Sequence, residues 1–375
     1  MHLFGIPYSK TGIRTPGSPE MNLALLPQAP VWVLDDPHSG AAGQASAIAG
    51  RLGLPFRRLT GAPNQAHRPG GPGPGLVLSA GMGSGLTALL LRSRHGCRVV
   101  HCATGRISGE KLSGWLPFDL TIVPQLYAPS ETREGVQPEI QGGAAAYAAA
   151  SAFGAPGPGA TGPGTTGPSR MGPSRMGLSR TIPVLGAPNV VSPGMLARAR
   201  DLWAERLSHL PQPRVVLLFG GSDQQAALGL GRQVAALVRE RGGCVLASVL
   251  PSGGPAGDAL AAGLSASLHL IYRADEPGED PTLGFLGHAD AVVVAGVGAL
   301  TLSEACAASA PIFSAAVGHE RREARRLLER LHQAGQVRPL GADLSPWPRQ
   351  PLDEAGRVAQ EIRNRFGSPA RRMQD

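Results

Sequence analysis

Short apolar runs alternate with amphipathic stretches of helical length from Val31 onward. The runs are VWVLDD, PFRRLT, LVLSAG, RVVHCA and DLTIVP, and helix-like stretches cover residues 42–52 and 86–94. Strands that are buried on both faces appear in sequence as nearly continuous apolar runs, and helices between them cover the sheet. This first alternation therefore predicts a parallel sheet with flanking helices.

A second alternation of the same kind follows a helical stretch over residues 195–207. Its strand-like runs are RVVLLFGG, CVLASVL, LHLIYRA, ADAVVVAG and APIFSAA, and its helical stretches cover residues 225–241 and 300–308. An amphipathic helix over residues 352–366 closes the pattern, and we expect it to pack back across the first domain. The predicted fold class is α/β, with two Rossmann-like parallel-sheet domains that face a cleft.

Two segments lack the apolar pattern and mark the limits of these domains. The first 30 residues carry scattered prolines without a long apolar run, so they predict a disordered leader rather than a signal peptide. A Gly/Pro/Ser-rich stretch with a repeated GPSRMG unit cannot bury apolar surface and predicts a disordered insertion. The predicted division is a leader at 1–30, an N-terminal domain at 31–150, the insertion at 151–181, a C-terminal domain at 182–350, and a final helix and tail at 351–375.

Composition limits the partners and the compartment. The formal net charge of +8 favours an anionic partner, but aromatic residues make up only 4% of the chain and we find no nucleic-acid-binding motif, so we expect no nucleic acid. The four cysteines lie in or beside apolar stretches, as free thiols do in a reducing compartment. The spacing of His95, Cys97, His101 and Cys102 matches no zinc pattern, so we predict no metal site. These features indicate a cytoplasmic protein, and an arginine-rich helix after His319 allows peripheral contact with an anionic membrane surface.

The segment LLFGGSDQQAAL carries the first candidate site. A buried strand runs into Gly220, Gly221 and Ser222 and then into a helix. Glycines let the backbone approach a ligand closely, and the positive end of the helix favours a phosphate. The alternative is a tight turn in which Ser222 or Asp223 only caps the helix.

The segment ADAVVVAGVGALTLSEA carries the second candidate site. Another buried strand ends in a loop with Gly296 and Gly298, and the following helix bears Ser303 and Glu304. A carboxylate one turn inside such a helix is well placed to accept hydrogen bonds from ribose hydroxyls. The alternative for Glu304 is a solvated charge on the helix surface.

These two motifs together resemble the donor half of GT-B glycosyltransferases, especially the enzyme that adds N-acetylglucosamine to the lipid intermediate of peptidoglycan. A longer resemblance covers about Val31 to Phe366 and is similar, block by block, to the "elongated mitochondria" family of mitochondrial-fission proteins. Blocks such as VWVLDDPHSGAAGQASAIAGRLGLPF, LVLSAGMGSGLTALLLR and GAPNVVSPGMLARARDLW carry it. The bacterial members of this family are regarded as glycosyltransferases.

The resemblance implies roles for matching residues only. Gly220, Gly221 and Ser222 would meet a diphosphate, and Gly298, Ala299 and Leu300 would form a second phosphate loop. Ser303 and Glu304 would contact the ribose. Tyr272 and Arg273 would contact the base. The chain departs from the family where it has Ala103, Thr104, Gly105 and Arg106 in place of an Asp-Pro-Arg stretch, and where it has Gly296 and Val297 in place of an Asp-Ser pair.

The first domain supplies candidates for catalysis and for the acceptor. An inverting transfer needs a group that accepts the proton of the acceptor hydroxyl. In the loop LDDPHSGAAGQ, His38 or an aspartate of raised pKa such as Asp35 would serve, and we predict His38 as this base. An exposed loop histidine is the alternative for His38. The predicted acceptor-side cleft comprises Ser39, Gly40, Gln44, Gly81, Ser84 and Arg106.

The predicted function is transfer of a sugar from a nucleotide sugar, expected to be UDP-linked, to a lipid or saccharide acceptor. No metal and no other cofactor are expected, because helix ends and loop N–H groups would neutralise the leaving diphosphate. A noncatalytic nucleotide-binding or scaffold protein is the alternative, which the departures from the family favour. A nucleotide-sugar epimerase would need several carboxylates in the cleft, and the sequence offers few beyond Asp35 and Asp36.

Overall fold

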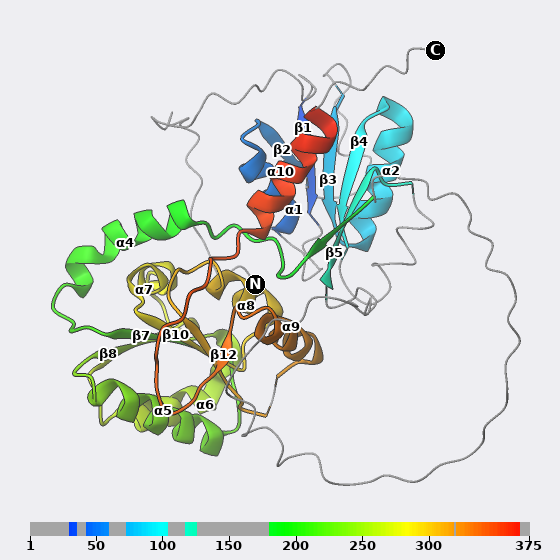
Figure 1. Ribbon diagram of the computed structural model, residues 1–375. Coiled ribbons are helices and arrows are strands. Elements are labelled where there is room, and N and C mark those ends of the chain that lie inside the picture. The colour runs from blue at the N-terminus through cyan, green and yellow to red at the C-terminus, as the bar shows by residue number, and fades with distance from the viewer. Residues whose placement is uncertain are drawn as a thin grey trace, which may run out of the picture. The chain divides into compact units, whose positions relative to one another are not determined.

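The computed structural model describes residues 30–35, 43–59, 73–103, 117–125, 180–318 and 320–367. The predicted leader up to residue 29, the predicted insertion up to residue 179 and the predicted tail after residue 367 lie outside these ranges. The described residues form two six-stranded sheets in which every strand pairing is parallel. Figure 1 shows both sheets with helices beside them. The predicted α/β class with two Rossmann-like parallel sheets is confirmed.

The first sheet has the strand order β2-β1-β3-β4-β5-β6. Its strands are β1 (Val31–Asp35), β2 (Phe56–Leu59), β3 (Leu76–Ala80), β4 (Arg98–Cys102), β5 (Leu120–Pro124) and β6 (Thr181–Val184). Helix α1 (Gln44–Leu52) follows β1, and helix α2 (Met82–His95) follows β3. Both helices end at a glycine in the left-handed conformation, Gly53 with φ of 70° and Gly96 with φ of 64°, which stops a helix without strain.

The two faces of the first sheet pack against different helices. Alternate residues of β1 point to opposite faces, so Val31 and Val33 pack with α1 while Trp32 and Leu34 pack on the side of α2. Helix α10 (Glu354–Gly367) joins the face of α1 through its apolar residues, Ala355, Val358, Ala359 and Ile362. The first sheet is thus a three-layer unit.

The C-terminal helix packs on the first domain, as the sequence predicts. Arg51 at the end of α1 donates to a carboxylate oxygen of Asp353 from Nε at 3.2 Å and from Nη2 at 3.1 Å. Arg363 of α10 donates to the carbonyl oxygen of Arg51 at 3.0 Å. Figure 1 shows α10 running alongside α1.

The second sheet has the strand order β12-β11-β10-β7-β8-β9. Its strands are β7 (Arg214–Phe219), β8 (Cys244–Val249), β9 (His269–Arg273), β10 (Ala291–Ala295), β11 (Ile312–Ala315) and β12 (Arg338–Pro339). Its helices are α4 (Pro193–Leu207), α5 (Gln224–Arg239), α6 (Gly254–Leu264), α7 (Thr282–His288), α8 (Ala299–Ala305) and α9 (Arg322–Gln333), with a short 3-10 turn at Pro251–Gly253. This sheet too has helices on both faces, because α5 and α6 cover one face and α4, α7, α8 and α9 cover the other.

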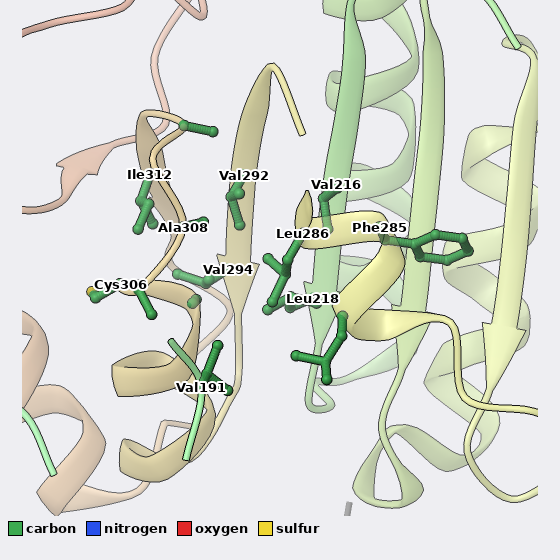
Figure 2. Packing of buried hydrophobic residues seen from close by; sticks show 14 of the residues in the cluster. Val191, Val216, Leu218, Phe285, Leu286, Val292, Val294, Cys306, Ala308 and Ile312 are labelled. Atoms are coloured by element: carbon green, nitrogen blue, oxygen red, sulfur yellow. The ribbon is translucent and has the colours of Figure 1, made fainter. Parts of the chain in front are cut away.

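The core of the second sheet follows the alternation of its strands. Val216 and Leu218 of β7 and Val292 and Val294 of β10 point to the α7 face, where Leu286 lies beside them (Figure 2). All five side chains are at most 4% exposed. Burial of apolar surface of this kind contributes about 25 cal/mol for each Å² removed from water. Among the described residues, no helix is long and apolar enough to cross a bilayer.

Candidate functional site

The carboxyl ends of β7 and β10 lie side by side in the second sheet. From β7 the chain builds outward to β8 and β9, and then returns to the other side of β7 to form β10. In open α/β sheets, ligands bind at such a switch point, outside the carboxyl ends of the strands. Gly220 directly follows β7 and Gly296 directly follows β10, so the structure brings the two glycine loops together at this point.

These two loops pass so close to each other that only glycine fits. The N–H of Gly220 donates to the carbonyl oxygen of Ala295 at 2.9 Å. A Cβ atom on Gly220 would stand 2.3 Å from the carbonyl oxygen of Gly296, and one on Gly296 would stand 2.0 Å from that of Gly221. Gly296 also has a φ of 63°, and Gly221 a φ of 117°, which side chains rarely adopt. The glycines are therefore needed for the packing of the protein itself.

Ser222 and Asp223 directly precede α5, and Asp223 is the N-cap residue of this helix. The carboxylate of Asp223 accepts the N–H of Ala226 at 2.8 Å, and the Ser222 hydroxyl donates to the carbonyl of Asp223 at 2.7 Å. The helix start thus already carries a negative side chain as its N-cap. The alternative that Asp223 caps this helix is therefore observed, and a diphosphate there would have to face its carboxylate.

Helix α8 begins at the second loop without such a cap. Gly298 is the N-cap residue, no side chain caps the helix, and the first turn carries no acidic residue. A Cβ atom on Gly298 would meet nothing within 4 Å. The loop residues Gly298, Ala299 and Leu300 are partly exposed, and their role as a second phosphate loop stays a prediction.

Ser303 is buried and bonded on both sides. Its hydroxyl donates to the carbonyl of Ala299 at 2.7 Å and accepts the N–H of Ala187 at 2.9 Å. Its exposed fraction is 2%. Ser303 therefore positions α8 against the segment that follows β6.

Glu304 is the neighbour of Ser303 but has a different environment. It is 6% exposed, and its carboxylate makes no hydrogen bond or ion pair with the residues that the structure describes. Burial, together with the nearby Asp280 carboxylate, raises the pKa of Glu304 to about 8. The alternative of a solvated surface charge is wrong, because the side chain is almost fully enclosed. A buried carboxyl group without partners, beside a switch point, is suited to accept hydrogen bonds from a ligand.

Asp280, which lies between β9 and α7, was not predicted from the sequence as a site residue. Its carboxylate accepts the N–H of Thr282 at 2.8 Å, and it raises the pKa values of both Glu304 and Tyr272. The dipeptide of Asp280 and Pro281 directly before α7 was the available signal, because Asp and Pro are typical of helix starts. Asp280 adds negative charge to this corner of the site.

Tyr272 and Arg273 are the last two residues of β9, at the carboxyl end of the strands of this sheet. Tyr272 is partly buried against the α7 side of the core. The guanidinium of Arg273 forms ion pairs with the carboxylates of Asp258 at 2.8 Å, Asp275 at 3.4 Å and Glu276 at 3.1 Å. Because Arg273 is held by three acids, Tyr272 is the freer of the two to contact a ligand.

A small pocket opens beside Gly296, between β10 and α9. Its lining is Val294, Ala295, Gly296, Val297, Leu302, Ala315, Glu320, Ala324 and Leu328. Glu320 is the only charged residue of this lining, and its carboxylate accepts the N–H of Val317 at 2.9 Å. The pocket is therefore mainly apolar and adjoins the glycine loops.

The structure describes only some of the residues that are predicted for the acceptor side, which lie in the first domain. Asp35 ends β1 and pairs in register with Ala80 of β3, which Gly81 follows. Gly81 begins α2 with a φ of 90°, and the Ser84 hydroxyl donates to the carbonyls of Ala80 at 2.6 Å and Gly81 at 2.9 Å. Gln44 begins α1 and is buried. His38, Ser39, Gly40 and Arg106 lie outside the described residues, so the predicted base stays a prediction.

The residues His95, Cys97, His101 and Cys102 of the first domain differ in burial, because His95 is partly exposed and the other three are buried. All four cysteines of the chain are buried. His101 is 1% exposed, lies 2.9 Å from the Ser79 hydroxyl through Nδ1 and stacks on Phe118. Within the described ranges, no group of three or more His, Cys, Asp and Glu residues could hold a metal ion.

Comparison with solved structures found distant similarity over most of the chain. MurG from Acinetobacter baumannii is 12% identical with a TM-score of 0.40, covering 91% of each chain. The UDP-GlcNAc 2-epimerase from Neisseria meningitidis, bound to UDP-GlcNAc, is 11% identical with a TM-score of 0.43, covering 90% of this chain and 92% of that chain. Another UDP-N-acetylglucosamine 2-epimerase is 14% identical with a TM-score of 0.44, covering 89% of this chain and 86% of that chain.

A search of curated proteins found no match. The model of one protein family, described as Mitochondrial fission ELM1, matches residues 31–366. This range takes in both parallel sheets, the two glycine loops, the α8 carboxylate and nearly all of α10. The resemblance to the "elongated mitochondria" family is thereby confirmed, and the chain belongs to the Mitochondrial fission ELM1 family.

Proposed function

We propose that the carboxyl edge of the second sheet binds the nucleotide part of a nucleotide sugar, expected to be UDP-linked. The observation that carries this proposal is Glu304, a buried carboxyl group with no partner among the described residues. Hydroxyl donors of a ligand would supply hydrogen bonds that the described residues do not give to this carboxyl group. A ribose diol offers two adjacent donors to one carboxylate.

The surrounding residues support the same occupant. Gly298, Ala299 and Leu300 offer backbone N–H groups that no side chain caps, and we propose that they receive the diphosphate. Gly220, Gly221 and Ser222 border this place from β7. Tyr272, rather than the ion-paired Arg273, would lie against the base. In this proposal the diphosphate needs no metal ion, because the N–H groups stabilise its charge.

We further propose glycosyl transfer to a lipid or saccharide acceptor bound at the first sheet. His38 would take the proton of the acceptor hydroxyl while Asp35 orients it, and the donor half would stabilise the leaving diphosphate. Gln44, Gly81 and Ser84 border the carboxyl edge of the first sheet, where such an acceptor would bind. The protein would act in the cytoplasm, and contact with an anionic membrane would bring it to a lipid-linked acceptor.

Calorimetric titration with UDP, GDP and UDP-sugars tests the donor site. We expect one nucleotide to bind. Glu304→Gln should lower the affinity for this nucleotide roughly 10–100-fold, because a charge-assisted hydrogen bond contributes about 1.5–3 kcal/mol. The matched control is Glu205→Gln on exposed α4, which should bind as the wild type does. Equal affinities in all three proteins would refute the ribose assignment.

The alternative function is a noncatalytic nucleotide-binding or scaffold protein. The Asp223 carboxylate at the start of α5 favours a scaffold that binds no diphosphate at the first loop, because this charge opposes a diphosphate there. Release of UDP from UDP-sugars, measured with and without saccharide and lipid acceptors, separates the two functions. Transfer that His38→Asn abolishes without loss of UDP binding would support the enzyme, whereas binding without turnover in any mixture would support the scaffold.

A further inference from the structure

The edge strand β9 differs from the other three sheet edges. β2 carries Arg57 and Arg58, and both β6 and the two-residue β12 contain a proline. Charge, proline and short length are the devices that keep an exposed strand edge from pairing with another chain. β9 is five residues long and has no proline and no charge before its last residue, Arg273. Its edge is thus the least protected of the four.

Apolar side chains and free backbone groups coincide on this strand. Leu268 is 52% exposed and Leu270 is 41% exposed, and both point to the same face as Tyr272. The N–H of Val245 donates to the carbonyl oxygen of Leu268, and the N–H of Ala274 donates to the carbonyl oxygen of Val249. These two hydrogen bonds fix which residues of β9 bond to β8. In this register Leu270 and Tyr272 bond to β8, so the N–H and C=O groups of His269 and Ile271 point outward. No strand of the described residues pairs with them.

We propose that β9 pairs antiparallel with β9 of a second copy of this chain, about a two-fold axis at Leu270. In this register His269 of one copy and Ile271 of the other exchange both hydrogen bonds, so four outward groups of each copy are satisfied. Leu270 meets its own equivalent, and Leu268 lies opposite Tyr272. A register centred on Ile271 would require Arg273 to pair, but its carbonyl already accepts the N–H of Glu276 at 3.1 Å. Only the Leu270 register uses groups that are free.

The charges at the ends of the strand fit this arrangement. One guanidinium, that of Arg273, faces the three carboxylates of Asp258, Asp275 and Glu276, so the C-terminal end of β9 is acidic. The antiparallel register places this end over the partner's residues 265–267, which read Ser-Ala-Ser and carry no charge. The two acidic ends lie far apart from each other, and the exposed leucines come together at the axis.

The first test is the molar mass of the full chain by light scattering over a range of concentrations. We expect the mass of two chains for the wild type and of one chain for Leu270→Lys and for Leu270→Glu, because like charges at the axis repel. An equimolar mixture of these two variants should regain the mass of two chains. Circular dichroism checks that both variants are folded, and Leu202→Lys on exposed α4 is the control that should stay dimeric.

The second test is disulfide cross-linking of Leu270→Cys under mild oxidation. Cα atoms at a pair of this kind lie about 4.5 Å apart, within disulfide range, and the four native cysteines are buried. We expect Leu270→Cys to form a cross-linked dimer. We expect Leu268→Cys and Leu202→Cys to form no cross-link. A monomeric wild type at every concentration would overturn the proposal, as would a dimer that Leu270→Lys leaves intact. Neither result depends on nucleotide binding.

Discussion

The Ser303 hydroxyl accepts a 2.9 Å hydrogen bond from the N–H of Ala187, 116 residues earlier in the chain. The same hydroxyl donates to Ala299 within α8. A Cβ atom on Gly186 would stand 3.0 Å from this oxygen, so the backbone packs directly on the serine. Ser303 therefore joins α8 to the segment between β6 and α4.

Ser303→Ala should destabilise the protein more than it affects a ligand. The substitution leaves the partly buried Ala187 N–H without its partner, which costs up to about 1–3 kcal/mol. Chemical denaturation should show this loss, while the affinity of the folded variant for a UDP-sugar stays within about threefold of the wild type. A variant of unchanged stability that loses nucleotide affinity would instead support a direct contact with the ribose.

Replacement by serine should destabilise the protein at one glycine of this loop and have little effect at another. Gly296→Ser places a Cβ atom against the Gly221 carbonyl in a left-handed conformation, and we expect a loss of about 2 kcal/mol or more. Gly298→Ser places it in open space at an N-cap position that favours serine, so stability should change by less than about 0.5 kcal/mol. Denaturation curves of both variants measure this contrast. Equal losses would show that the two loops do not pack as described.

Most of this architecture could be predicted from the sequence, because the strands appear in it as recognisable apolar runs. RVVLLF and AVVVA are buried on both faces and appear as continuous apolar runs, and each forms a central strand of the second sheet. The docking of α10 was also predictable, since its apolar positions repeat with helical spacing. Patterns of this kind specify elements and faces well.

Other features depended on contacts that no local pattern reveals. Helix α6 was not predicted because GPAGDALAAGL is rich in Gly. Gly263 permits the close packing of α6 on α5, because a Cβ atom at this position would stand 2.5 Å from the carbonyl oxygen of Leu228. The strand TIPV of β6 contains a proline and lies beyond a long Pro/Gly-rich stretch, so nothing local assigns it to the first sheet. The burial of Glu304 and the ion pairs of Arg273 likewise follow only from tertiary packing.

His101 should make the protein sensitive to acid. Burial lowers its pKa from 6.5 to about 4, so between these values the unfolded chain binds the proton more readily than the folded protein. Stability should therefore fall as the pH drops from 6.5 to 4, by at most about 1.4 kcal/mol per pH unit from this group. His101→Gln should flatten this dependence, whereas the exposed His209→Gln should keep it. Identical slopes in all three proteins would contradict the burial of a neutral imidazole.

Glu304 should produce the opposite dependence at higher pH. Its pKa is raised from 4.5 to about 8, so the folded protein holds a proton that the unfolded chain releases, and stability should fall as the pH rises through this range. A ligand whose hydroxyls donate to the ionised carboxylate should show the reverse, binding up to about tenfold more tightly per pH unit until about pH 8. Glu304→Gln should abolish both trends, which thermal denaturation and titration with a UDP-sugar would measure. If the stability trend disappears in the variant but the affinity trend remains, Glu304 is a buried acid that does not touch the nucleotide.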